Sequence, residues 1–217
     1  MSPLNLGRSV EFPDPPLYRT MFANTIAAPI WLLVRLYVGW QFLHSGYEKA
    51  IGTGWLNNGG SSLESFWVRI VQVPATGKPP ISYDWYRSFI DFMLQNHWAE
   101  GFAKIIVIGE IAVGIALILG LFTGLAALGG ITMNFNFMLA GTASTNPVLF
   151  ALGVLLLLAW KVAGYYGLDR WLLPALGTPW SSRWSQRGSG DSAEPPAAGR
   201  IALDAGIAPP ATIGAPR

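Results

Sequence analysis

The sequence predicts an all-α integral membrane protein, a bundle of four helices. Of its 217 residues, 52% are hydrophobic and only 12% are charged, whereas soluble domains carry about 25% charged residues. The mean hydropathy is +0.38. Four apolar segments are long enough to cross a hydrocarbon core, which takes about 20 residues each. The 10 Trp, 7 Tyr and 11 Phe suit two aromatic belts at the membrane surfaces.

The four predicted spans are residues 28–45, 102–119, 121–139 and 147–163. Only "LGLFTG" separates the second from the third, which predicts a tight antiparallel hairpin. "AGTASTNP" joins the third to the fourth, and Pro147 suits the first turn of that last helix. Four spans place both termini on one side of the cell inner membrane. The distribution of Lys and Arg favours the cytoplasm as that side by a narrow margin.

Residues 50–100 form a long, partly helical connection between the first two spans. It contains the loop signals "GTGWLNNGG" and "GKPP". "SSLESFWVRIVQV" is a short amphipathic piece, and "DWYRSFIDFMLQNHW" places Trp85, Phe89, Phe92 and Met93 at helical spacing. We expect the second piece to lie on the membrane surface.

The two ends of the chain differ from the predicted transmembrane domain, residues 27–175. Residues 1–26 lack the features of a removable signal peptide, so we expect the first apolar segment to remain as an anchor. Residues 176–217 are rich in Pro, Ala, Gly and Ser without apolar periodicity, which predicts a disordered tail.

Several classes of function are excluded. The chain has no cysteine, which removes thiolate chemistry and cysteine-ligated iron–sulfur or zinc sites. The net charge of +2 without a Lys/Arg run argues against nucleic acid. Nucleotide-binding, zinc-protease and hydrolase motifs are absent. Two histidines without a motif do not support haem, and we expect no metal site.

Three polar residues within the predicted spans fall near one level of the bundle: Arg35, Glu110 and Asn134. Each stands four residues from a glycine, which allows close helix approach. These glycines are Gly39, Gly114 and Gly130. We expect an Arg35–Glu110 ion pair braced by Asn134. Two interpretations stay open: the group fixes the bundle, or it lines a ligand or proton path.

A second polar cluster is expected at the outer edge of the spans. His44 and Glu48 are one helical turn apart, and His97, Trp98 and Lys104 begin the second span on the same side. Such a pocket suits a quinone ring, with a histidine donating to a carbonyl and a carboxylate relaying protons. The alternative is an ordinary interfacial surface, because Trp, Tyr and Lys favour this level.

Three stretches carry a family resemblance: "RLYVGWQFLHSGYEK", "GEIAVGIALILGLFTGLAA" and "GYYGLDRWLLP". Together they resemble the DoxX/DoxD membrane-protein family over residues 30–175. The resemblance implies a four-helix membrane subunit. For its DoxD branch, which the long connection favours, it implies the membrane subunit of a thiosulfate:quinone oxidoreductase that works with a partner subunit. The positions matching the family pattern are Arg35, Gly39, Gly46, Lys49, Glu110, Gly114 and Asp169.

The leading hypothesis is a subunit of a quinone-linked oxidoreductase, with thiosulfate as the candidate donor, in contact with lipid and with a partner subunit or a second copy. We expect catalytic roles for His44, Glu48 and Glu110. We expect substrate or quinone contacts from Arg35, Lys49, Asn134, His97, Trp98 and Lys104. The alternative is a non-catalytic accessory subunit of a larger membrane redox complex. A small transporter is a third, weaker option.

Overall fold

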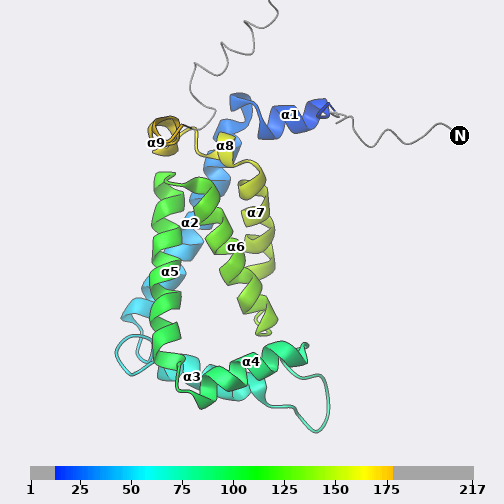
Figure 1. Cartoon of the computed structure of the whole chain (residues 1–217), viewed down its shortest axis with the longest axis vertical. Helices are drawn as coiled ribbons and strands as arrows, with labels where there is room; N and C mark the ends of the chain where they lie inside the picture. The colour runs from blue at the N-terminus through cyan, green and yellow to red at the C-terminus, as the bar shows by residue number, and fades with distance from the viewer. Residues whose placement is uncertain (1–12, 178–217) are drawn as a thin grey trace, which may run out of the picture. The chain divides into compact units, whose positions relative to one another are not determined.

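A computed structural model describes residues 13–177, and within that range the chain is helical without strands. Four longer helices pack side by side (Figure 1). They are α2 (Ala28–Ile51), α5 (Ala99–Leu119), α6 (Thr123–Leu139) and α7 (Asn146–Leu158). Helix α2 contacts α5 and α7, and α6 contacts the same two helices. All belong to the unit Met1–Leu176.

Two of these helices are long and apolar enough to cross a membrane: α2 together with the preceding short helix η1 (Thr25–Ala27), and α5. Helix α6 has 17 residues and α7 has 13, so both are shorter than the predicted spans suggest. The predicted fourth span is interrupted at Ala159, after which a short helix, α8 (Trp160–Ala163), begins. Helix α2 continues to Ile51, well past its predicted end at Ser45.

Small residues let α2 and α5 approach closely. A Cβ atom on Gly114 would lie 2.6 Å from the backbone nitrogen of Leu43, and one on Gly46 would lie 3.0 Å from the backbone nitrogen of Ile111. A Cβ on Gly39 would lie 3.1 Å from the carbonyl oxygen of Gly114. These contacts show that the helices are antiparallel and fix which residues stand level with one another.

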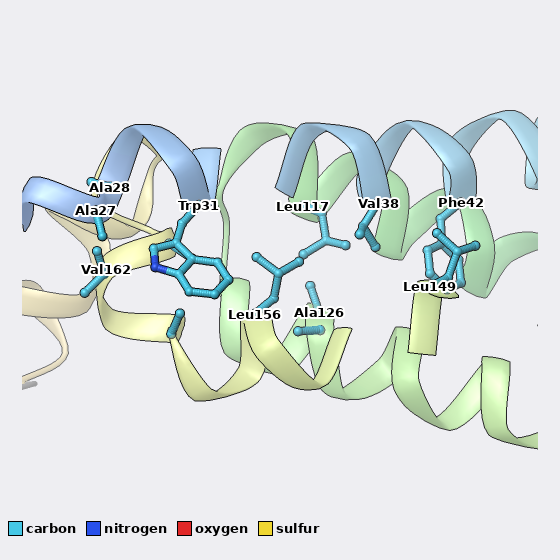
Figure 2. Close-up of a cluster of buried hydrophobic side chains, with 13 residues drawn as sticks. Ala27, Ala28, Trp31, Val38, Phe42, Leu117, Ala126, Leu149, Leu156 and Val162 are labelled. Carbon is cyan, nitrogen blue, oxygen red and sulfur yellow. The ribbon is translucent and has the colours of Figure 1, made fainter. Parts of the chain in front are cut away.

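The main apolar core fills the space between α2, α5, α6, α7 and α8 (Figure 2). In this core Val38 of α2 lies close to Leu117 and Phe42 lies close to Leu149, and all four are buried. Trp31 lies at one end of the core, where its indole nitrogen donates to the carbonyl of Met21 at 2.6 Å. Helix α1 (Pro16–Phe22) is thereby held against the start of α2.

The predicted long connection folds into two helices, α3 (Ser61–Val71) and α4 (Asp84–Gln95), across one end of α5 (Figure 1). A second apolar core joins them to α5 and α6, with Leu63, Trp67, Ile70, Ile81, Tyr86, Ile90, Met93, Ala99, Ala103 and Ala140. The Tyr86 hydroxyl donates to the carbonyl of Asn136 at 3.2 Å, and burial raises the pKa of Tyr86. Trp85, Phe89 and Phe92 remain exposed.

The opposite end of the four helices carries α1, α8 and α9 (Asp169–Ala175) (Figure 1). Residues 178–217 of the predicted disordered tail lie outside the described residues, as do residues 1–12 of the predicted N-terminal segment.

Candidate functional site

A buried ion pair joins the middle of α5 to the end of α2. The Lys49 Nζ atom lies 2.7 Å from each carboxylate oxygen of Glu110 and donates to the Ser45 hydroxyl at 2.6 Å. That hydroxyl in turn donates to Glu110 Oε1 at 3.3 Å. The Glu110 side chain is 2% exposed and the Lys49 side chain 21%. Access to this centre is therefore from the lysine side.

Aromatic rings bound that accessible side. The Lys49 ammonium lies 5.3 Å from the centre of the Trp55 ring and 5.9 Å from that of Phe137. Both distances suit cation–π attraction. Trp55 follows α2 directly and Phe137 belongs to α6, so three segments meet at the ammonium group.

The helix geometry explains why these side chains meet. Ser45 and Lys49 are four residues apart on α2 and therefore lie on the same side of the helix. Gly46 lies against Glu110, because a Cβ atom there would be 3.0 Å from the Glu110 Cβ. Without a side chain at Gly46, the carboxylate can enter between Ser45 and Lys49. We call Ser45, Lys49 and Glu110 the ion-pair centre.

Asn134 of α6 is buried, with 1% of its surface exposed, and its Nδ2 atom has no hydrogen-bond partner among the described residues. Its neighbour Met133 places its sulfur 3.4 Å from the position of a Cβ on Gly109, the residue before Glu110. Asn134 and Glu110 thus stand at the same level of adjacent helices, as the sequence predicts.

The predicted Arg35–Glu110 pair is wrong. Arg35 is fully buried and donates to two backbone carbonyls, to that of Ala163 at 3.0 Å and to that of Tyr166 at 3.2 Å. Its guanidinium fills the space beside Gly120 and Gly167, where an added Cβ would collide with it.

The wrong pairing came from the assumption that the start of α2 and the end of α5 lie at the same level. The prediction placed the start of α2 level with Gly120, but Gly120 stands beside Arg35 itself. Glu110 stands level with Gly46, about 16 Å farther along α2 at 1.5 Å per residue. Arg35 and Glu110 therefore belong to two separate polar layers.

Asp169 completes the layer around Arg35. Its carboxylate is buried and accepts hydrogen bonds from the backbone nitrogens of Phe122 at 2.6 Å and Thr123 at 2.8 Å. It thus caps α6, a helix distant in sequence, in addition to lying in the first turn of its own helix. The backbone nitrogen of Asp169 donates to the carbonyl of Gly120 at 2.8 Å. No local sequence signal indicates this partner, because the residues are joined only by the tertiary fold.

The predicted outer cluster is not assembled as one pocket. Leu43, next to His44, stands level with Gly114, about 22 Å from the start of α5 at Ala99. His44 pairs with Glu48 at 3.3 Å on an exposed side of α2. His97 precedes α5 and is exposed with a positive φ of 55°. The two histidines therefore lie at different levels of the molecule.

The remaining predicted residues sit at the start of α5. Trp98 is 47% exposed and its ring lies 5.6 Å from Phe92 and 6.3 Å from Phe102. Lys104 pairs with Glu100 at 2.6 Å, and both side chains are about half exposed. This is a surface arrangement typical of an interfacial helix end.

A shallow pocket of about 350 Å³ lies near the Arg35 layer, at the other end of the helices. Its lining residues are Leu119, Tyr165, Tyr166, Gly167, Leu168, Arg170 and Trp171. Among the described residues, no group of three or more His, Cys, Asp or Glu side chains is arranged to hold a metal ion.

Comparison with known proteins gives one family match. The family model named DoxX matches residues 30–143, which include α2 from its third residue, the α3–α4 connection, α5 and α6. Searches of curated proteins and of solved structures gave no match. The matched region covers more than half of the chain and contains the whole ion-pair centre. The chain belongs to the DoxX family of membrane proteins.

Proposed function

We propose that this DoxX-family chain is the quinone-binding membrane subunit of an oxidoreductase complex, with the ion-pair centre as its proton-donating site. In this arrangement α2, α5, α6 and α7 form a four-helix membrane bundle. The observation that carries the proposal is the buried Lys49–Glu110 pair between two helices apolar enough to cross a membrane. Ionisable groups at such positions are expensive and are generally functional.

The chemistry of the centre suits a quinone head group. Lys49 is the partly exposed member of the pair, and the rings of Trp55 and Phe137 offer apolar surfaces beside it. Reduction of a quinone to a quinol takes two electrons and two protons. Lys49 would donate one of these protons to a quinone oxygen and would regain it from water, which also supplies the second proton. Glu110 would hold the lysine in place and stabilise its charge.

The electrons must come from a donor outside this chain's own side-chain chemistry. The chain has no cysteine, so a sulfur donor such as thiosulfate would not form a persulfide on it. The electron balance requires a partner subunit. This subunit would remove two electrons from the donor and pass them to the quinone.

A second candidate, a non-catalytic accessory subunit, is favoured by a different observation. The Lys49 ammonium has three N–H donors, and it already bonds both Glu110 oxygens and the Ser45 hydroxyl. A fully satisfied pair is also what a purely structural clamp between α2 and α5 requires.

Titration of the purified protein with a short-chain benzoquinone distinguishes the two candidates. Glu110→Gln is compared with Glu100→Gln, which removes a carboxylate from an exposed ion pair on the same helix. A quinone site predicts binding weakened by about tenfold or more in Glu110→Gln and unchanged in Glu100→Gln. No binding in any of the three proteins would leave the accessory role, and saturable binding that is equal in all three would exclude the ion-pair centre as the quinone site.

Glu110→Gln leaves Lys49 without its counter-charge, so a loss of quinone binding in this variant could reflect misfolding. A second variant without either charge distinguishes misfolding from loss of the site. Lys49→Leu with Glu110→Leu removes both charges and replaces them with apolar groups, a change that folded proteins commonly tolerate. This double variant should keep most of the thermal stability of the wild type and lose quinone binding. Retained binding in a stable double variant would count against the centre as the quinone site.

A further inference from the structure

The side of α2 that faces away from the other helices exposes aliphatic residues near its two ends, among them Leu33 and Ile51, and polar and aromatic residues between them. Five of these residues share one side of the helix: Tyr37, Trp40, His44, Tyr47 and Glu48. The first four are spaced by three, four and three residues, and Glu48 lies four residues after His44. Tyr37, Trp40 and Tyr47 are 46%, 59% and 57% exposed. The side chains of His44 and Glu48 are 50% and 65% exposed. We call these five residues the α2 outer face.

This face lies at the level of the middle of α5. His44 follows Leu43, which packs on Gly114, and Glu48 lies half a turn beyond Gly46, which packs on Ile111. The outer side of α5 near that level is aliphatic instead. It exposes Ile105, Ile108, Ala112 and Ile115.

The contrast between the two helices matters because lipid tails cannot solvate a carboxylate or an imidazole. The aliphatic side of α5 is what lipid requires. Trp and Tyr prefer the membrane surfaces to the hydrocarbon centre. The α2 outer face therefore needs a protein surface against it where α2 crosses the bilayer.

We propose that the α2 outer face is the dimer interface with a second copy of this chain. The proposal rests on α2 and α5 crossing the membrane, as in the proposed function. Two copies inserted in the same orientation are related by a two-fold axis along the membrane normal, so their α2 helices run parallel. Side chains at alternating intervals of three and four residues suit such a parallel pair.

Charge complementarity selects a second copy as the occupant. His44 and Glu48 already pair at 3.3 Å within one chain, and one helical turn separates them. In a parallel pair of helices each His44 lies within reach of the partner's Glu48. The same two residues thus supply donor and acceptor on both sides, which makes the face complementary to itself. The Trp40 ring stacks on His44 with centres 5.7 Å apart and covers the pair from one side.

Disulfide crosslinking in membranes tests the interface directly, because the chain has no cysteine of its own. Trp40→Cys and Tyr47→Cys place single thiols on the α2 outer face. Ile105→Cys and Ile108→Cys serve as matched controls, since both side chains are more than 60% exposed on α5. We expect oxidised dimers from the first two variants and not from the controls. Absence of dimers from the first two, or equal amounts from all four, would overturn the proposal.

A charge experiment tests the pairing itself. Glu48→Lys should lower the dimer fraction in lipid nanodiscs, counted by single-molecule photobleaching, by about tenfold, because like charges across an interface are strongly unfavourable. Exchanging the two residues, His44→Glu with Glu48→His, preserves the complementarity and should restore the dimer. A dimer fraction unchanged by Glu48→Lys would contradict the pairing, and so would failure of the exchange variant to restore it.

The same preparations separate this proposal from the proposed function. Quinone binding at the ion-pair centre depends on Lys49 and Glu110, which point into the bundle, whereas dimer formation depends on the opposite side of α2. A dimer without quinone binding supports the interface alone, and a quinone-binding monomer overturns the interface alone.

Discussion

Lys49 at the end of α2 and Glu110 in the middle of α5 form a two-oxygen ion pair, with the ammonium 2.7 Å from each carboxylate oxygen. The pair joins α5 to the end of α2 that leads to α3, while Arg35 occupies a separate layer near α8 and α9. The two cations of α2 thus have different partners. Lys49 neutralises a carboxylate, and Arg35 bonds the backbone carbonyls of Ala163 and Tyr166.

Removing one member of the ion pair should destabilise the protein. Lys49→Leu leaves the Glu110 carboxylate buried without a counter-charge, which costs about 3–5 kcal/mol for a buried pair. Reversible unfolding in mixed detergent micelles measures the loss. Lys49→Leu with Glu110→Leu should recover most of it. A double variant as unstable as the single one would show that packing, and not the unpaired charge, is responsible.

Gly46→Ala should loosen α2 from α5. Its Cβ would lie 2.8 Å from Cγ1 of Ile111 and 3.0 Å from the Ile111 backbone nitrogen, so the helices must separate, at a cost of about 1–3 kcal/mol. Gly101→Ala on α5 is the control, because nothing lies near its added Cβ. That control should be neutral or stabilising, as alanine favours helix by about 1 kcal/mol. Equal melting temperatures for the two variants would argue against close packing at Gly46.

Gly120→Ala should disturb the Arg35 layer. Gly120 has φ +66°, and its added Cβ would occupy the position of the Arg35 guanidinium. Gly77→Ala has a similar backbone requirement, φ +95°, with open space around it. The control should lose about 1 kcal/mol from backbone strain, and Gly120→Ala should lose about 1–3 kcal/mol more from crowding. Thermal unfolding measures the stability of both variants, and the difference between their losses gives the cost of crowding at Arg35.

Asp169→Ala should loosen the turn between α5 and α6. It removes an acceptor for the backbone nitrogens of Phe122 and Thr123, and loss of a helix cap costs about 0.5–2 kcal/mol. Faster amide exchange at residues 121–124, followed by mass spectrometry, is the expected signature. Asp84→Ala, which removes an exposed carboxylate paired with Arg87, should leave exchange there unchanged. Exchange at 121–124 that is unaltered by Asp169→Ala would exclude the cap.

The sequence predicted the helices well because their apolar segments and turn signals are local. The α5–α6 hairpin and the helical connection between α2 and α5 are confirmed. The end of α2 was placed too early, because "HSGYEK" contains charged residues that resemble a helix exit. Lys49 was expected to contact the substrate, and its pairing with Glu110 was not predicted.

The pairing of charges could not be predicted from depth along each helix. It depends on the relative shift of α2 against α5, which the glycine contacts fix and which no local pattern reports. The carboxylate of Asp169 illustrates the same point, because its partners Phe122 and Thr123 are adjacent only in the folded chain. The prediction that His44 and His97 lie in one outer cluster was wrong for the same reason, because the two residues lie at different levels along α5.

The most direct test of the central claim is the amount of quinone that co-purifies with the chain, measured after organic extraction in wild type and in Glu110→Gln, with Glu100→Gln as the matched control. The ion-pair centre predicts near-stoichiometric quinone in wild type and control, and its loss in Glu110→Gln. Equal quinone in all three proteins would contradict the centre as a quinone site, and no quinone in the wild type would favour the accessory role.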